Sequence, residues 1–351
     1  MDQPAHIRRE EFSRHEGRIL FIVESRNGAE RSTLVNRLNS RIASADMTDR
    51  CSLIHLPVSD GKSNTQLRKL AEVIESQPDD ALLVPVRLAW KIPDFHSDRT
   101  VKLRHFLLGD PRQPGAIRSR LILMRDPKRT QMLQGKPATV AALRHRFDKQ
   151  NIEKDGENDF ASFVARQAGL ALDIEERGFQ GSRYKVPRYV GEALRSDPNF
   201  RAELTDLAKQ TNETESGLLE KSKKYMKELI ARPTPLFIDL RTRMEQSNFS
   251  KGFEDEVRYK EGSIDKLRAI MREYPTLLLF THKTYIDGAT PNKMLYDHDL
   301  PMAHVFGGIN MDLFGLGAFL RKTGTIFIRR SFSDNLLYKA VLRHYIGYLL
   351  E

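Results

Sequence analysis

Alternation between short apolar runs and helical segments is the feature of this sequence that most constrains its fold. The apolar runs are residues 276–281, 303–306 and 325–329, and the helical segments that follow them are residues 288–297, 311–322 and 333–350. Strands joined by helices pair in parallel, because each helix carries the chain back to the end of the sheet where the next strand begins. The pattern therefore predicts a mainly parallel sheet flanked by helices.

A histidine and an aspartate follow the first apolar run. His282 and Asp287 lie five residues apart just beyond Phe280, at the carboxyl end of the expected strand, where α/β sheets place their ligands. The same spacing occurs after His55 and His105, but both of these continue into turn sequences. The strand before His282, and not the spacing, therefore selects this pair as a candidate site.

The chemistry that suits this pair is ester formation. An alcohol attacks a thioester at neutral pH only if it loses its proton during the attack, and histidine titrates near that pH. A carboxylate bonded to the far ring nitrogen fixes the tautomer and stabilises the imidazolium. Because five residues of regular helix would separate the two side chains, we expect a turn at Lys283 and Thr284 before the helix begins. The alternative is a strand-end histidine hydrogen-bonded to a helix cap.

Two adjacent arginines end the third apolar run. Arg329 and Arg330 follow the run 325–328, and neighbouring side chains on a strand point to opposite faces. One of them can therefore reach a ligand while the other serves the surface. Guanidinium groups match phosphate oxygens, which indicates a phosphorylated alcohol as the acceptor. The alternative is two solvated arginines at the end of an element.

Together these residues resemble the glycerol-3-phosphate 1-O-acyltransferases, in particular the large bacterial membrane-bound type, from about residue 272 to residue 350. The first block of that family, His-x-x-x-x-Asp, is found at residues 282–287, and the second, Gly-x-x-Phe-Ile-Arg-Arg, at residues 324–330. Gly-Ile-Asn at residues 308–310 lies between them, and Asn-Leu-Leu-Tyr at residues 335–338 comes after them. Several motifs in the family's order and spacing make the resemblance specific.

The resemblance implies a role for each matching residue. His282 would act as general base on the sn-1 hydroxyl of glycerol 3-phosphate, and Asp287 would orient it. The implied substrate-binding residues, with Arg330 as the main phosphate ligand, are Arg330, Arg329, Gly324 and Asn310. Acyl-CoA or acyl carrier protein would be the acyl donor and lysophosphatidate the product, in the first step of phospholipid synthesis. No covalent acyl-enzyme, metal or cofactor is implied.

The family's third block, Glu-Gly-x-Arg, and its fourth, a proline on a later strand, are not found in this sequence. We therefore expect a truncated chain with an incomplete catalytic domain and impaired acyltransferase activity. Two alternatives stay open. One is a non-catalytic lipid- or phosphate-binding fragment. The other is acylation of a different lipid alcohol, such as lysophosphatidate or dihydroxyacetone phosphate.

Three regions are expected along the chain. Apolar runs at residues 18–23 and 81–88, with a helix at 27–44 after the first, predict an amino-terminal α/β region over residues 1–150. Residues 151–260 form a predicted helical region, in which apolar residues such as Leu218, Met226 and Leu229 recur at helical spacing. Residues 261–351 form the incomplete acyltransferase domain. The whole is of the α/β class.

The charge balance fits the implied partners. The chain has 57 basic and 47 acidic residues, a net charge of +10, which suits an anionic membrane surface, a phosphorylated substrate, coenzyme A or an acidic carrier protein. The basic residues are scattered among acidic ones without stacking aromatics, so no nucleic-acid partner is expected. Cys51 is the only cysteine, which excludes disulfide scaffolds and cysteine zinc sites and fits a reducing cytoplasm.

No run of the sequence is long and apolar enough to predict a transmembrane helix. We therefore expect peripheral contact with the cytoplasmic face of the cell membrane. Aromatic and aliphatic residues near Phe314 are candidates for an acyl-chain groove or for contact with lipid, and the alternative is ordinary helix packing.

Overall fold

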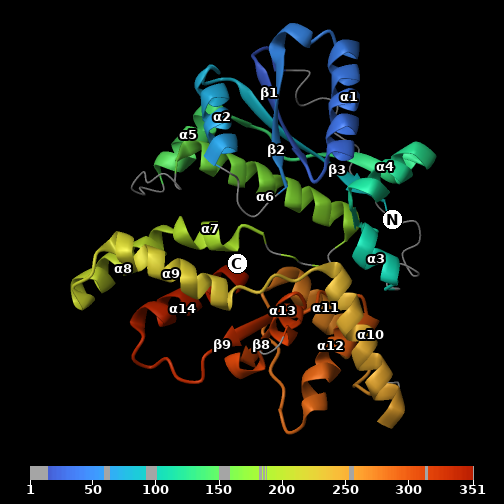
Figure 1. Ribbon diagram of the computed structural model, residues 1–351, viewed down its shortest axis with the longest axis vertical. Helices are drawn as coiled ribbons and strands as arrows, with labels where there is room; N and C mark the ends of the chain where they lie inside the picture. The colour runs from blue at the N-terminus through green and yellow to red at the C-terminus, as the bar shows by residue number, and fades with distance from the viewer. Residues whose placement is uncertain are drawn as a thin grey trace. The chain divides into compact units, whose positions relative to one another are not determined.

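The computed structural model describes residues 15–58, 64–91, 101–149, 159–181, 184, 186, 188–252, 257–312 and 315–350. The chain divides into two compact units, residues 1–181 and 182–351 (Figure 1). Phe314, one of the residues predicted to contact an acyl chain, lies outside the described residues. None of the described helices is long and apolar enough to cross a membrane.

The first unit is built on a twisted, mostly parallel sheet. Its strands are β1 (Ile19–Ser25), β2 (Cys51–Pro57), β3 (Leu82–Trp90), β6 (Thr130–Gln134) and β7 (Ala138–Thr139). The order is β2-β1-β3-β6; β1 is parallel to both neighbours, whereas β6 and β7 run antiparallel to β3. Every residue of β1 is buried, because this central strand has helices on both faces.

Helices cover the two faces of this sheet (Figure 1). Helices α1 (Gly28–Ser44) and α4 (Ala116–Arg125) pack on the face that carries Phe21, and helices α2 (Asn64–Glu75), α5 (Val140–Asp148) and α6 (Phe160–Gln180) pack on the face that carries Leu20. The remaining elements are η1 (Thr48–Arg50), α3 (Leu103–Leu108), β4 (Gly109–Asp110), β5 (Gln113–Pro114) and η3 (Pro127–Arg129). The predicted strands, the helix after the first of them and the α/β class are confirmed.

A proline interrupts β3 where its partner strand changes. Pro85 lies between the residues paired with β7 and those paired with β6, and its carbonyl accepts a hydrogen bond of 2.9 Å from the Gly135 N–H. The N–H that proline lacks faces the same connection, so no ladder hydrogen bond is lost there. A Cβ at Gly135 would lie 3.0 Å from the Pro85 Cγ, which explains the glycine at this crossing.

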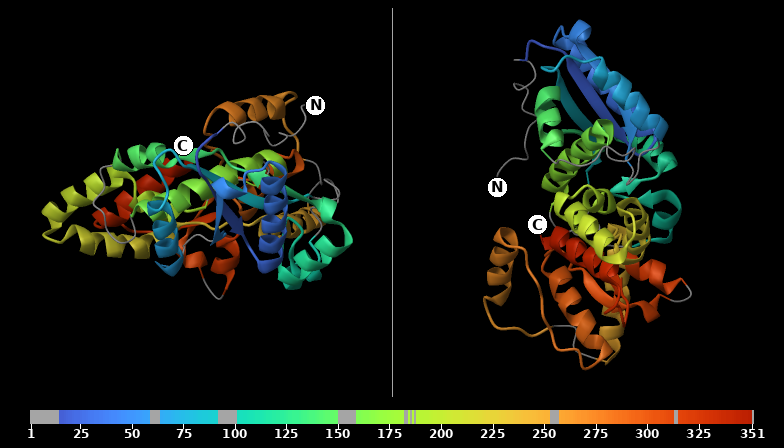
Figure 2. Two further views of the ribbon diagram at one scale, coloured as in Figure 1. Left: turned by 90° about the horizontal axis from the view of Figure 1, so that it is seen from above. Right: turned by 90° about the vertical axis from the view of Figure 1, so that its left-hand side faces the viewer.

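The second unit is mainly helical around a small parallel sheet of β8 (Val305–Gly308) and β9 (Thr325–Ile328). Its helices are α7 (Val190–Arg195), α8 (Pro198–Thr211), α9 (Glu215–Leu229), α10 (Pro235–Gly252), α11 (Ser263–Glu273), α12 (Ala289–Asp297), α13 (Leu316–Arg321) and α14 (Leu336–Leu350), with short turns η4 (Tyr285–Gly288) and η5 (Ile309–Met311). Tyr338, Val341 and Tyr345 of α14 form the core with α7, α8, α9 and β9. Figure 2 shows α14 against α8 and α9. The predicted helical middle region is confirmed.

The strand predicted at residues 276–281 is not formed. Leu277, Leu279 and Phe280 are 68%, 88% and 45% exposed, and within the described ranges no strand pairs with this run. An apolar run becomes a buried strand only where a neighbouring strand supplies hydrogen-bond partners and a helix covers its face. The prediction of a strand, which used the apolar pattern alone, was therefore wrong.

Candidate functional site

The turn between His282 and α12 is closed by a carboxylate. Asp287 Oδ2 accepts hydrogen bonds from the backbone N–H groups of Lys283 and Thr284, each 2.7 Å long. The predicted turn at Lys283 and Thr284 is confirmed. These bonds, with Thr284 contributing most and Lys283 next, hold the pKa of Asp287 below its usual value. The carboxylate is therefore ionised at neutral pH.

His282 stands at the surface of this turn. Its imidazole is exposed and lies edge-on to the Phe280 ring, with 6.0 Å between the ring centroids. No hydrogen bond joins the His282 ring to Asp287, both of which are described residues. The two backbone hydrogen bonds fall on one carboxylate oxygen and do not use Oδ1. The structure therefore places the pair on one turn, and their hydrogen bond stays a prediction.

Arg329 is held in a clamp formed by the side chains of Glu228, Tyr225 and Tyr338. Its Nε and Nη2 each donate a 2.7 Å hydrogen bond to the Glu228 carboxylate, and its guanidinium lies 5.1 Å and 4.9 Å from the ring centroids of Tyr225 and Tyr338. The Arg329 N–H also donates to the Tyr338 hydroxyl over 3.2 Å. A bidentate ion pair between two aromatic rings fixes both the charge and the direction of this side chain.

Arg330 has the opposite environment. It is exposed, and the described part of the chain gives its guanidinium no ion-pair partner. Glu228 thus occupies the Arg329 guanidinium, and which of the two arginines reaches a ligand stays a prediction. No hydrogen bond or ion pair joins either arginine to His282 or Asp287 among these described residues.

The backbone geometry around Gly324 and Asn310 accounts for the glycines at positions 324 and 308. Gly324 has φ +98°, a conformation that favours glycine, and its carbonyl is 3.2 Å from Nδ1 of His304. It precedes β9, whereas Arg330 follows it, so the two lie up to roughly 20 Å apart along the chain direction of the strand. Asn310 is exposed in η5, and a Cβ at Gly308 would lie 2.5 Å from its Oδ1. Substrate contacts of Gly324 and Asn310 stay predictions.

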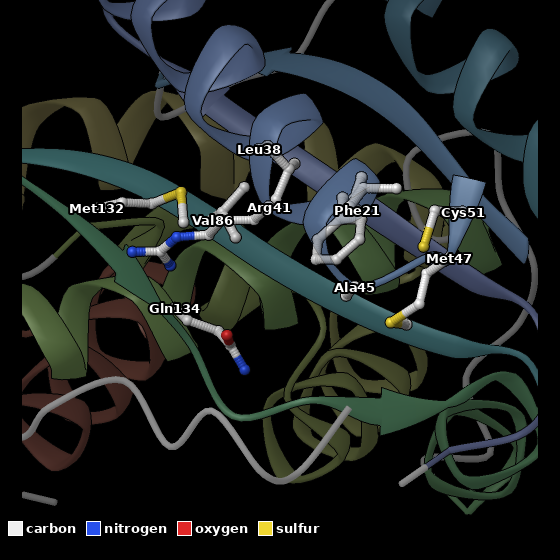
Figure 3. A pocket seen from close by; sticks show the side chains of 10 residues that line it. Phe21, Leu38, Arg41, Ala45, Met47, Cys51, Val86, Met132 and Gln134 are labelled. Carbon is white, nitrogen blue, oxygen red and sulfur yellow. The ribbon is translucent and has the colours of Figure 1, made fainter. Parts of the chain in front are cut away.

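Two small pockets in the described part of the chain are too small for a substrate. One lies beside His304 and Gly324 in the second unit, and the other in the first unit is lined by Phe21, Cys51 and Met132 among others (Figure 3); each is about 10 Å³. Such a volume holds about one water molecule. Burial lowers the pKa of His304 and raises that of the Cys51 thiol, so both groups are neutral at pH 7.

Reasoning from sequence missed the clamp around Arg329. Glu228 is 101 residues away from Arg329 in the chain, and nothing in its local pattern marks it. Tyr338 belongs to the motif at residues 335–338, which was the one available signal. Asn335 of the same motif caps α14, with Oδ1 accepting from the Tyr338 N–H over 2.9 Å, and donates through Nδ2 to the Tyr225 hydroxyl over 2.8 Å.

Residues 262–351 match the family model described as Acyltransferase. This segment belongs to the acyltransferase family. It contains His282, Asp287, Asn310, Gly324, Arg329 and Arg330. The family match therefore covers every residue of the candidate site.

Curated relatives of this chain are also named as acyltransferases. Dihydroxyacetone phosphate acyltransferases from Bos taurus and Homo sapiens are 37% and 36% identical over 108 residues, which is 30% of this chain and 16% of each relative. A glycerol-3-phosphate acyltransferase from Pseudoalteromonas atlantica is 25% identical over 200 residues, 56% of this chain and 24% of that protein. The chain thus spans at most about a quarter of the length of these acyltransferases.

Proposed function

We propose that this chain carries the acceptor-binding and general-base part of a glycerol-3-phosphate 1-O-acyltransferase. The supporting observation is that His282 and Arg330 are both exposed and have no ion-pair partner among the described residues, whereas Arg329 and Asp287 are held by hydrogen bonds within the same family-matched segment. The reaction moves an acyl group from acyl-CoA or acyl carrier protein to the sn-1 hydroxyl of glycerol 3-phosphate and gives lysophosphatidate.

In this proposal His282 removes the hydroxyl proton as the oxygen attacks the thioester carbonyl. The carbon–sulfur bond breaks, the thiol of the donor leaves, and the proton passes from the imidazolium to the thiolate. Asp287, ionised because of its backbone hydrogen bonds, stabilises the imidazolium electrostatically and can accept from it through Oδ1. The step needs no covalent acyl-enzyme.

Arg330 binds the acceptor phosphate. A guanidinium without a carboxylate partner offers a planar fork of donors to phosphate oxygens. Arg329 is a positioning residue in this proposal, because its donors to Glu228 are already used. The chain acts at the cytoplasmic face of the cell membrane as a peripheral protein, where both the acyl acceptor and the lipid product are found.

A second acceptor is supported by a specific observation. The Bos taurus relative that is 37% identical is named as a dihydroxyacetone phosphate acyltransferase. Dihydroxyacetone phosphate presents the same primary hydroxyl and phosphate as glycerol 3-phosphate and differs at the middle carbon. Acylation rates with the two acceptors at equal concentration decide between them.

The test is glycerol-3-phosphate-dependent release of free thiol from acyl-CoA by the whole chain. We expect His282→Ala to lower the rate by about 100-fold or more, in the range typical of a lost general base. His145→Ala, at an exposed position of α5, is the matched control and should leave the rate unchanged. Equal rates in the wild type and His282→Ala would remove the catalytic assignment. Binding of the acceptor without any turnover would favour a non-catalytic phosphate-binding fragment.

A further inference from the structure

Helices α3 and α4, which contact each other in the first unit (Figure 1), carry exposed apolar side chains. Ile117, Leu121 and Met124 of α4 are 70%, 44% and 76% exposed, and Phe106 and Leu107 of α3 are 46% and 79% exposed. We call these five residues the α3–α4 apolar face. Residues 117, 121 and 124 follow helical spacing, so they form a stripe along one side of α4.

This face does not result from a loosely attached helix. The opposite side of α4 packs through Ile122 and Leu123 against the sheet core, and Ser119 is fully buried. Ser119 Oγ donates to the Pro114 carbonyl over 3.0 Å and accepts from Asn27 Nδ2 over 3.1 Å. The fold thus fixes α4 with one apolar side buried and a second apolar side facing outward.

The charge around this face is strongly positive. Residues 101–129 contain eight Lys or Arg and two Asp, a net charge of +6, whereas the whole chain has +10. Arg120, Arg125 and Lys128 are exposed and flank the stripe, and none has an ion-pair partner among the described residues. More than half of the net charge therefore lies in less than a tenth of the chain, next to its apolar face.

We propose that the α3–α4 apolar face is a docking surface for an anionic phospholipid bilayer. Large side chains between basic residues suit the boundary between lipid headgroups and acyl chains, because the apolar groups insert while the cations remain at the phosphates. A nucleic acid would satisfy the cations and leave Ile117, Leu121 and Met124 in water. The α3–α4 apolar face would give the proposed membrane location a defined surface, and only the biological meaning of that surface rests on the proposed function.

Vesicle binding by the whole chain, without acyl donor or acceptor, tests the proposal independently of acyl transfer. We expect binding to vesicles of phosphatidylcholine mixed with phosphatidylglycerol and much weaker binding to phosphatidylcholine alone. The triple variant Ile117→Gln, Leu121→Gln, Met124→Gln should lower the partition coefficient at least about tenfold. The triple variant Arg120→Gln, Arg125→Gln, Lys128→Gln should lower it on the order of 100-fold at low salt.

Matched controls separate docking from general charge and folding. A control triple variant removes three exposed cations elsewhere in the first unit: Lys69→Gln, Arg146→Gln, Lys149→Gln. It should reduce vesicle binding far less than the triple variant at Arg120, Arg125 and Lys128. Because the substituted side chains are exposed, we expect all three variants to unfold in urea as the wild type does. Unchanged unfolding would show that the fold is kept. Wild-type binding to neither vesicle, or equal binding by the wild type and the stripe variant, overturns the proposal. The wild type could instead dimerise in the absence of lipid, and the stripe variant could abolish that dimer. This result would assign the α3–α4 apolar face to a second copy of the chain and would also overturn the proposal.

Discussion

At the level of single residues, the ion pair between Arg329 and Glu228 gives the two arginines of the second motif different environments. Arg330→Ala should raise the KM for the phosphorylated acceptor by about tenfold or more and leave stability unchanged, because its guanidinium is exposed and has no ion-pair partner among the described residues.

Arg329→Ala should lower the free energy of unfolding by about 1–2 kcal/mol, since it loses a partly exposed ion pair and two ring contacts. Acceptor titrations and urea unfolding measure the two effects, and the reverse distribution would contradict the division.

We expect His304 to make the stability of the second unit sensitive to acid. Burial lowers its pKa, so the folded state holds the neutral ring while the unfolded chain takes up a proton near pH 6.5. The unfolded state then binds more protons, and stability falls as the pH drops below the unfolded pKa toward the folded one. His304→Asn, which keeps a donor toward the Gly324 carbonyl, should show a smaller loss of stability between pH 7.5 and 5.5 in urea unfolding. An equal loss in both proteins would show that other groups cause it.

At the level of elements, an ion cluster joins α6 to the sheet of the first unit. Arg87 of β3 is fully buried and pairs with Glu24 of β1 and with Asp173 and Glu176 of α6, the latter two at 2.6 Å and 2.7 Å. Burial lowers the pKa of Arg87, but the three carboxylates outweigh it and raise that pKa, so the side chain is always charged.

Arg87→Met should therefore destabilise the first unit by about 3–5 kcal/mol, because it removes a buried cation that pairs with three carboxylates. Thermal unfolding monitored by circular dichroism measures the loss. Arg68→Met, at a side chain that is 76% exposed in α2, is the control and should change stability by less than about 0.5 kcal/mol. Similar losses for the two variants would refute a structural role for the cluster.

Helices and strands were predictable from sequence where the pattern of apolar residues within the element itself determines which side chains are buried. The continuous apolar run of β1, the helix capped by Asn27 and the periodicity of α9 all follow from local residues. The run at 276–281 was not predictable in this way, because strand formation depends on a partner strand. In the same way, the motifs identified the candidate site residues, but the side chains that hold Arg329 come from a distant helix and needed the fold.

At the level of the whole molecule, the chain consists of two compact units. The second contains its own core around Tyr338, Val341 and Tyr345, with burial raising the pKa of Tyr345 to about 12 and its hydroxyl accepting from the Ala231 N–H. We expect residues 182–351, expressed alone, to unfold cooperatively in urea at a midpoint close to that of the same transition in the full chain. A non-cooperative transition would show that the second unit depends on the first.

The change of partner along β3 also bears on how the protein behaves at high concentration. One edge of the sheet consists of β6, with five residues, and β7, with two, separated by the connection Gly135-Lys136-Pro137, in which Lys136 is exposed. Short edge strands, a lysine and a proline are devices that keep sheet edges from pairing with other chains. We therefore expect the interrupted edge opposite Pro85 to resist edge-to-edge pairing of the first unit with other chains.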